Sequence, residues 1–241
     1  MRLAFCFTGQ PRDVKNTLDD IKSSWCDNQD VDFFFHSWFG EEGVPFKNDV
    51  PSDVYRDDLF DYIIDKINPV NYLVEQPKEF KTYPDSPHWP CGHPKFNPNP
   101  TYSSQCQFYS NMKCIELKSE HEKKNNFEYD AVIRCRFDYI FFDKYDISKY
   151  DMNYLHVKND CSHTEYALND MLALSNTPNM NIYGDLFNHL DKYFNMGIEF
   201  NPEVILGYHI LHNNVKVAKT LGDNTDGEIS THPERLANRF I

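Results

Sequence analysis

Short apolar runs alternate with helical patterns in the first third of the chain. The runs at residues 2–8, 31–36 and 70–74 have the length and apolar character of buried strands, whereas residues 13–25 and 53–67 carry apolar side chains at helical spacing. Alternation of this kind is typical of a parallel sheet that helices cover. The pattern therefore predicts an α/β protein with a parallel sheet that helices cover.

The rest of the chain continues the pattern with longer helices. One segment stands apart, because residues 77–100 hold seven of the 14 prolines and cannot form regular structure. We expect a long surface loop there, within one domain that spans residues 1–241. Further helices are expected at residues 102–124, 169–175, 179–193, 202–212 and 233–241, and further strands at 129–138, 154–157 and 215–218.

Charge and cysteine use exclude several classes of function. The chain has 24 Lys and Arg against 37 Asp and Glu, a net charge of -13, which argues against binding nucleic acid or an anionic membrane surface. No apolar run approaches the ~20 residues of a membrane helix, so we expect no membrane insertion. Seven cysteines without a CxxC pair indicate reduced thiols and a cytoplasmic location. The sequence also lacks the glycine-rich phosphate loops of dinucleotide-binding and P-loop proteins.

Polar residues stand where the first two predicted strands end. Thr8, Gly9 and Gln10 follow the first strand, with Arg12 shortly after, and His36 ends the second. Ligands bind at the carboxyl ends of the strands in parallel sheets. Gly9 permits close approach of the backbone, and the helix that follows offers free N–H groups to an anion. The alternative is a plain turn with an exposed arginine.

The most informative segment runs from Arg134 to Asp138. Strand side chains alternate, so Arg134, Arg136 and Asp138 share one face if the strand continues through them. Arginine suits phosphate through paired hydrogen bonds, and aspartate suits a hard divalent cation that bridges phosphates. Together they predict a diphosphate site with a metal ion. The alternative is an internal Arg–Asp ion pair that ties the strand to a helix.

Two later carboxylates are candidates for acid–base work. Asp170 follows Asn169, and Glu203 follows Asn201 and Pro202. Asp170 has the chemistry to bind the transferred group or to accept a proton from an acceptor hydroxyl, and Glu203 is the second candidate base. Asn before a helix, Pro at its first position and an acidic residue in its first turn are also ordinary helix-start features. Capping is therefore the alternative interpretation at both places.

These segments resemble a family of nucleotide-sugar glycosyltransferases found in large DNA viruses, phages and bacterial polysaccharide clusters. The resemblance covers about residues 1–212, and its most specific part is the Tyr-Asp-x-Val-Ile-Arg-x-Arg-x-Asp run. The residues that carry it are Phe7-Thr8-Gly9-Gln10-Pro11-Arg12, His36-Ser37-Trp38, Tyr129 to Asp138, Asn169-Asp170 and Pro202-Glu203.

The resemblance implies the glycosyltransferase A fold, a single three-layer α/β/α domain with a mostly parallel central sheet and a nucleotide-binding N-terminal half. For a viral chain it also implies the host cytoplasm as the location. It implies a nucleotide-diphosphate sugar as donor, a glycan or other hydroxyl as acceptor, and transfer of a hexose or pentose. The residues that it places around the donor are Thr8, Gly9, Gln10, Arg12, His36, Arg134 and Arg136. If the reaction inverts the anomeric centre, the resemblance places Asp170 first and Glu203 second as general base. If the reaction retains the anomeric configuration, the role of Asp170 changes to positioning.

The resemblance also implies a divalent cation, Mn²⁺ or Mg²⁺. In that fold the metal is commonly held by an Asp-x-Asp motif, and here the matching positions read Arg136-Phe137-Asp138. Two possibilities follow from this departure. Either Asp138 suffices as the metal ligand with the diphosphate and water, or Arg136 replaces part of the charge of the cation.

Three other functions share parts of this pattern. A non-catalytic glycan- or nucleotide-binding module of the same fold is the main alternative, because the first Asp of Asp-x-Asp is missing. A hydrolase would use Asp138 and Asp170 as a carboxylate pair, but it leaves Arg134 and Arg136 without a role. A phosphotransferase or nucleotidyltransferase would share the metal and phosphate chemistry.

Overall fold

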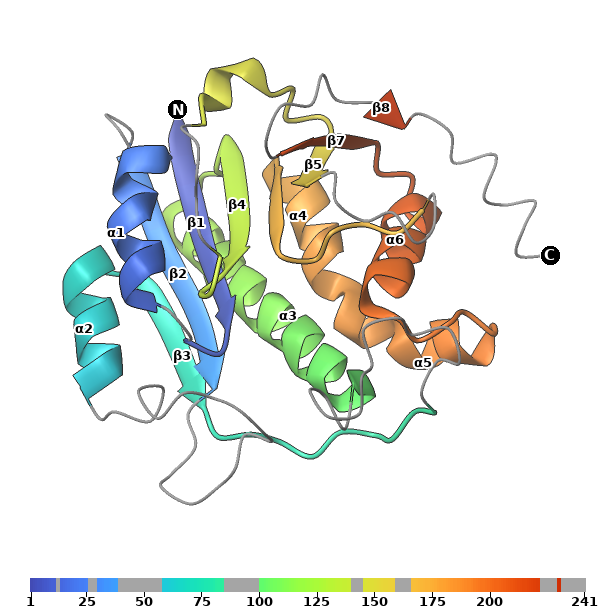
Figure 1. Ribbon diagram of the computed structural model, residues 1–241. Helices are drawn as coiled ribbons and strands as arrows, with labels where there is room; N and C mark the ends of the chain where they lie inside the picture. The colour runs from blue at the N-terminus through green and yellow to red at the C-terminus, as the bar shows by residue number, and fades with distance from the viewer. Residues whose placement is uncertain are drawn as a thin grey trace.

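The computed structural model describes residues 1–11, 14–25, 30–38, 58–84, 100–139, 145–158, 166–221 and 229–230. Its N-terminal part alternates β1 (Arg2–Gly9), α1 (Val14–Ser24), β2 (Asp30–Trp38), α2 (Asp58–Ile67) and β3 (Asn71–Glu75) (Figure 1). The alternation predicted from the apolar runs is therefore confirmed.

The C-terminal part begins with a long helix and then mixes short helices and strands. Its elements are α3 (Pro100–Asn125), β4 (Ala131–Arg136), η2 (Ile147–Lys149), β5 (Leu155–Lys158), β6 (Leu172–Ser175), α4 (Thr177–Gly184), η3 (Asp185–His189), α5 (Leu190–Asn195), α6 (Pro202–His212), β7 (Val217–Leu221) and β8 (Ile229–Ser230). The helix predicted at residues 179–193 is divided into α4, η3 and α5. The helix predicted at 233–241 lies outside the described residues.

Among the described residues, eight strands form one mixed, mostly parallel sheet in the order β3-β2-β1-β4-β6-β5-β7-β8. The strands β3, β2, β1 and β4 are mutually parallel, and β5 is parallel to β7, whereas β6 and β8 pair antiparallel with their neighbours. The chain moves from β1 to β2 and β3 on one side, and then returns to place β4 on the other side of β1. Such a reversal is where open α/β sheets bind ligands, at the carboxyl ends of the strands.

The side chains of β1 divide between two hydrophobic clusters. Leu3, Phe5 and Phe7 belong to the cluster that includes residues of α1 and α2. Ala4 and Cys6 belong to the cluster that includes residues of α3, α4 and α6. This alternation shows that helices pack on both faces of the sheet, as Figure 1 also shows. Arg134 is paired in register with Cys6, so it shares the α3 face.

The helix predicted at residues 169–175 is wrong. Residues Leu172–Ser175 form β6, which is buried and pairs with both β4 and β5. A short apolar run does not distinguish a buried strand from a buried helical segment, and here the two neighbouring strands decide. Asp170 consequently precedes a strand rather than opening a helix.

The start of the proline-rich segment is attached to the C-terminal half. Residues 76–84 have no regular structure, as predicted, and 85–99 lie outside the described residues. Tyr83 is buried, stacks on Phe200 and donates from its hydroxyl to Asp191 Oδ1 at 2.7 Å. In the described ranges no helix has the length and apolar character needed to cross a bilayer.

Candidate functional site

The turn after β1 is fixed from two sides. Gly9 has a φ of +97°, a conformation that favours glycine. Its N–H donates to Ser110 Oγ of α3 at 2.8 Å, and its carbonyl accepts from Ser37 Oγ of β2 at 2.9 Å. Gln10 continues this turn, and Arg12 lies outside the described residues. This is the turn that the sequence analysis expects to bind the nucleotide-sugar donor. Side chains of β2 and α3 therefore hold it in place.

Thr8 and Arg134 lie beneath the carboxyl edge of the sheet. Thr8 Oγ1 donates to Asn111 Oδ1 at 2.9 Å and accepts from Arg134 Nε at 2.9 Å. Arg134 Nη1 donates to the backbone carbonyl of Asp170 and to Tyr183 Oη, the latter at 3.4 Å. Thr8 is 1% exposed and Arg134 is fully buried. Both side chains are therefore buried beneath the strand ends and position them through hydrogen bonds.

The buried charge of Arg134 is only partly compensated. In the described part of the chain its partners are uncharged oxygens, and its Nη2 atom has no hydrogen-bond partner. An unpartnered buried donor on a charged group is costly. Burial raises the pKa of the neighbouring Tyr183 hydroxyl, while the charge of Arg134 opposes this shift. The guanidinium thus places positive potential directly below the strand ends, where an anion is stabilised.

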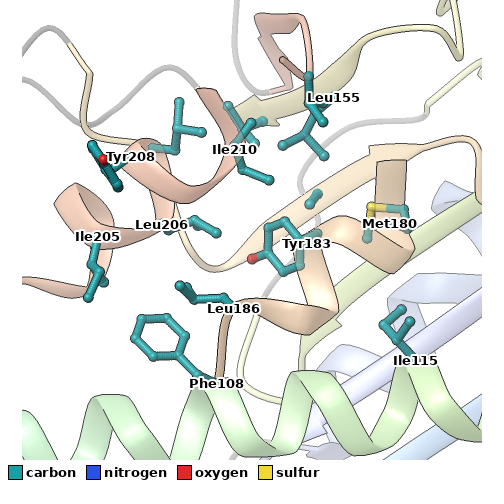
Figure 2. Close-up of a cluster of buried hydrophobic side chains, with 14 of the residues drawn as sticks. Phe108, Ile115, Leu155, Met180, Tyr183, Leu186, Ile205, Leu206, Tyr208 and Ile210 are labelled. Atoms are coloured by element: carbon teal, nitrogen blue, oxygen red, sulfur yellow. The ribbon is translucent and has the colours of Figure 1, made fainter. Parts of the chain in front are cut away.

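Tyr183 reaches Arg134 from a tightly packed cluster. Figure 2 shows Tyr183 and Met180 of α4 between Phe108 and Ile115 of α3 and Leu206 of α6. All five side chains are buried. This packing fixes the Tyr183 hydroxyl and, through it, one side of the Arg134 guanidinium.

Arg136 and Asp138 form a two-bond ion pair at the edge itself. Arg136 Nε donates to Asp138 Oδ1 at 2.8 Å, and Nη2 donates to Oδ2 at 2.6 Å. Their side chains are 27% and 17% exposed. Burial alone would lower the pKa of Arg136, but the bonds to Asp138 and the charges of Asp138 and Asp170 outweigh it and raise that pKa. An Arg–Asp ion pair is therefore present, but it joins the end of β4 to the turn that follows it instead of tying the strand to a helix. It engages both oxygens of the predicted metal ligand.

Backbone hydrogen bonds of the segment around Asp170 hold it beside Arg136. Asn169 Oδ1 accepts from the N–H of Met171 at 2.9 Å and of Leu172 at 3.4 Å, so Asn169 makes the turn into β6 instead of capping a helix. The N–H of Arg136 donates to the carbonyl of Met171 at 3.1 Å. Asp170 is 8% exposed, and within the described ranges its carboxylate has no hydrogen-bond partner. The structure therefore brings Asp170 together with Arg134, Arg136 and Asp138.

Glu203 lies at the start of α6, and its backbone contacts the segment that leads to Asp170. Asn201 caps this helix, because its Oδ1 accepts from the N–H of Glu203 at 3.1 Å and of Val204 at 3.2 Å. The carbonyl of Glu203 accepts from the N–H of Leu168 at 3.1 Å. At Gly207 a Cβ atom would lie 1.9 Å from a backbone oxygen of the 166–168 segment, so only glycine allows this close contact. The capping interpretation thus holds for Asn201, and α6 supports the backbone that leads to Asp170.

His36 lies inside a buried hydrogen-bonded chain. Its Nε2 is 3.0 Å from Glu75 Oε2, and its Nδ1 is 2.8 Å from Ser110 Oγ, the atom that accepts from Gly9. An N–H on Nε2 donates to the carboxylate, which leaves Nδ1 as an acceptor. The Ser110 hydroxyl lies within hydrogen-bond distance of both Nδ1 and the carbonyl of His36, the latter at 3.1 Å, and has one proton to donate between them. Burial lowers the pKa of His36 to about 4, although Glu75 opposes the shift. His36 is therefore neutral at pH 7 and supports the Gly9 turn from below.

This buried neutral histidine predicts a specific loss of stability in acid. The unfolded chain binds a proton below pH ~6.5, and the folded chain does not bind it until about pH 4. The free energy of unfolding therefore falls as the pH is lowered through this window, by about 2 kcal/mol for this group between pH 7 and pH 5. His36→Gln is expected to remove that part of the pH dependence, measured by urea unfolding at both pH values.

A second histidine provides the matched control for this measurement. Burial also lowers the pKa of His209 to about 4, so His209→Gln is expected to flatten the pH dependence by the same amount. An unchanged difference between pH 7 and pH 5 in His36→Gln would show that folding does not lower the pKa of His36.

Comparison with known proteins adds no relative. No family model matches the chain, and no curated protein matches it significantly. The interpretation of the site therefore rests on its geometry and chemistry.

The residues available to a metal ion are few. Asp138 and Asp170 are the carboxylates of the cluster, and the described residues contain no group of three or more His, Cys, Asp or Glu that would hold a metal. Mg²⁺ and similar cations often bind one or two carboxylates together with substrate phosphates. The donor set fits such a cation only after Asp138 is released from Arg136.

A groove of about 620 Å³ lies elsewhere, between α3 and α4. It is lined by residues such as Met112, Glu116, Asn181 and Asp185, and it shares no residue with the charged cluster. We assign the candidate site to the strand ends, where the charged side chains converge, and not to this groove.

Sequence reasoning missed the helical residues that support the site. Ser110 and Asn111 of α3 bind the Gly9 turn and Thr8, and Gln107 Nε2 donates to the carbonyl of Asp170 at 3.0 Å. Ser110 and Asn111 are buried although they are polar. Adjacent polar residues between the apolar Tyr109 and Met112 of a long helix are the signal that would have indicated them.

Proposed function

We propose that this protein is a glycosyltransferase that moves a hexose or pentose from a nucleotide-diphosphate sugar to a hydroxyl of a glycan or another acceptor. The observation that carries the proposal is the convergence of Arg134, Arg136, Asp138 and Asp170 at the carboxyl edge between β1 and β4, where the strand order reverses. Cationic and acidic groups at such an edge suit a diphosphate leaving group and a hydroxyl nucleophile. The proposed architecture is the three-layer glycosyltransferase A fold with a nucleotide-binding N-terminal half.

In this proposal each residue has a defined task. The Gly9 turn, Gln10 and Arg12 bind the nucleotide and its phosphates, with His36 and Thr8 holding the turn. Arg136 binds the diphosphate directly, and Arg134 stabilises its charge from below. Asp170 accepts the proton of the acceptor hydroxyl, with Glu203 as the second candidate base. A divalent cation, Mn²⁺ or Mg²⁺ held by Asp138, would stabilise the departing diphosphate.

Binding of nucleoside diphosphates tests the donor site. The thermal unfolding midpoint of the protein is measured with a panel of nucleoside diphosphates that differ in base, each with Mn²⁺ and with EDTA. A ligand that binds the folded state raises the midpoint by mass action. We expect one base to give the largest rise and Asp138→Ala to reduce it, whereas Glu116→Gln on the outside of α3 leaves it unchanged. The proposal fails if no nucleotide raises the midpoint under either condition.

A second candidate is a non-catalytic glycan- or nucleotide-binding module of the same fold. One observation favours it, namely that both carboxylate oxygens of Asp138 accept hydrogen bonds from Arg136. Release of nucleoside diphosphate from a nucleotide sugar in the presence of acceptor distinguishes the two. Tight binding without release supports the module, and continuous release supports the transferase.

We propose a cytoplasmic location for either function. The free thiols of Cys6, Cys106, Cys114 and Cys135 support it, because such thiols stay reduced in the cytoplasm.

A further inference from the structure

Two side chains converge on one backbone oxygen beside the candidate base. Gln107 Nε2 of α3 donates to the carbonyl of Asp170 at 3.0 Å, and Arg134 Nη1 donates to the same carbonyl. A carbonyl oxygen only accepts hydrogen bonds, so the amide of Gln107 must present its nitrogen to it. This bond fixes the orientation of the amide and leaves Oε1 as its free end.

The free end of this amide has an unused capacity to accept a hydrogen bond. Among the described residues, the side chain of Gln107 makes only the hydrogen bond from Nε2, and it is half-buried. In the same part of the chain, the carboxylate of Asp170 also has no hydrogen-bond partner. Two acceptor groups, both tied to one backbone carbonyl, thus lack a donor. Acceptors that are partly withdrawn from water are the ones that gain most from a hydroxyl of a ligand.

The position of Gln107 on α3 places it near the ends of the strands. This helix connects β3 to β4, so it begins at the carboxyl edge of the sheet and runs back along one face (Figure 1). Ser110 and Asn111 lie one turn further along the same side of the helix, where they hold the Gly9 turn and Thr8. Gln107 is therefore one turn closer to the beginning of α3, at the edge where the donor is proposed to bind.

We propose that Gln107 is a specificity-determining residue that accepts a hydrogen bond from a hydroxyl of the sugar to be transferred. This inference rests on the proposed function and names a residue that selects the sugar. Arg134 shares the carbonyl of Asp170 with Gln107, and it lies below the strand ends where the diphosphate is proposed to bind. Because the sugar is bonded to that diphosphate, Gln107 Oε1 and the Asp170 carboxylate are the acceptors offered to its hydroxyls.

An amide oxygen held in one orientation can distinguish one sugar from another. A sugar with a hydroxyl at the matching position donates to Oε1, whereas an epimer or a deoxy sugar leaves Oε1 unpaired and still displaces its water. An unpaired, partly buried acceptor weakens binding by about tenfold. The charge of Arg134, which neutral oxygens compensate only in part in the described structure, acts on the diphosphate whichever sugar it carries. Arg134 therefore contributes to affinity but not to the choice of sugar.

Affinities for a matched set of ligands test this role. Isothermal titration calorimetry is carried out on the parent protein and on Gln107→Met, with Mn²⁺ and without acceptor. The ligands are the nucleoside diphosphate chosen from the panel and nucleotide sugars of the same base that carry glucose, galactose, mannose or xylose. The parent protein is expected to prefer one sugar by about tenfold. Gln107→Met is expected to bind that sugar about tenfold less tightly and to keep its affinity for the nucleoside diphosphate within about twofold.

A matched substitution separates recognition of the sugar from a loss of structure. Gln105→Met makes the same change on the same helix, where the amide of Gln105 donates to the carbonyl of Thr101 at 3.3 Å. This control is expected to leave the preference among sugars unchanged. Gln107→Ala replaces Gln107→Met if the first variant does not fold. A purely structural role of Gln107 predicts equal losses for the nucleoside diphosphate and for every nucleotide sugar.

The possible outcomes are distinguishable. Loss of the sugar preference in Gln107→Met, with retained affinity for the nucleoside diphosphate, establishes the role. Equal losses for all ligands, an unchanged preference, or an effect confined to KM for the acceptor overturns the role and leaves the proposed function standing. A parent protein that binds the nucleotide but shows no preference among sugars has the same consequence. Absence of nucleotide binding with and without Mn²⁺ overturns the proposed function, and the role of Gln107 with it.

Discussion

Replacing Asp170 by Asn is expected to lower kcat for sugar transfer by about 10²- to 10⁴-fold, the usual contribution of a general base. The substitution removes the charge and keeps the shape, and the contacts of Asp170 with Arg134 and Gln107 use its backbone carbonyl. The carboxylate itself has no hydrogen-bond partner in the described part of the chain, so little structure depends on it. Steady-state assays of nucleoside diphosphate release, with nucleotide affinity measured in parallel, check this expectation.

Two comparisons give the Asp170 result its meaning. Glu116→Gln removes a carboxylate from the outer surface of α3 and is expected to leave kcat unchanged. If Asp170→Asn keeps the parental kcat while Glu203→Gln lowers it, the base is Glu203. If neither changes kcat, proton transfer does not depend on a carboxylate from these two segments.

The strand ends were predictable because two simple patterns specify them. The apolar runs before Gly9 and His36 and the run that leads into Arg134 are long enough to be strands, and parallel strands end at one edge. The alternation of side chains along β4 then places Arg134 and Arg136 on one face. The spacing of residues along the chain was sufficient to predict these strand ends and the shared face of Arg134 and Arg136.

The burial of each side chain and the identity of its hydrogen-bond partners could not be predicted in the same way. Arg134 is buried because Thr8, Tyr183 and the carbonyl of Asp170 come from three other elements to bind it. Spacing gives no information on such long-range contacts. The choice between a diphosphate site and an internal ion pair for Arg136 also depends on the turn at Asp138, which bends the chain back toward the guanidinium.

A second polar network, away from the strand ends, joins α3 to the start of α4. Lys118 Nζ donates to Glu122 Oε2 at 2.9 Å, to Asn181 Oδ1 at 2.9 Å and to Thr177 Oγ1 at 3.4 Å. Glu122 Oε1 accepts from the hydroxyl of Thr177 at 2.6 Å and from the N–H of Tyr129 at 2.9 Å. Lys118 is fully buried and Glu122 is 5% exposed. Each charge therefore depends on the other for its compensation.

Lys118→Met is accordingly expected to lower the free energy of unfolding by about 3–5 kcal/mol, because it leaves the buried carboxylate of Glu122 without its cation. Urea unfolding followed by circular dichroism measures the loss. The double variant Lys118→Met/Glu122→Gln is expected to recover most of it, since Gln keeps an oxygen for Thr177 and Tyr129 without the charge. Lys113→Met, which breaks a partly exposed pair on the same helix, is expected to cost at most about 1 kcal/mol. Equal losses in Lys118→Met and Lys113→Met would contradict this account, because they would mean that burial of the Lys118 charge has no energetic consequence.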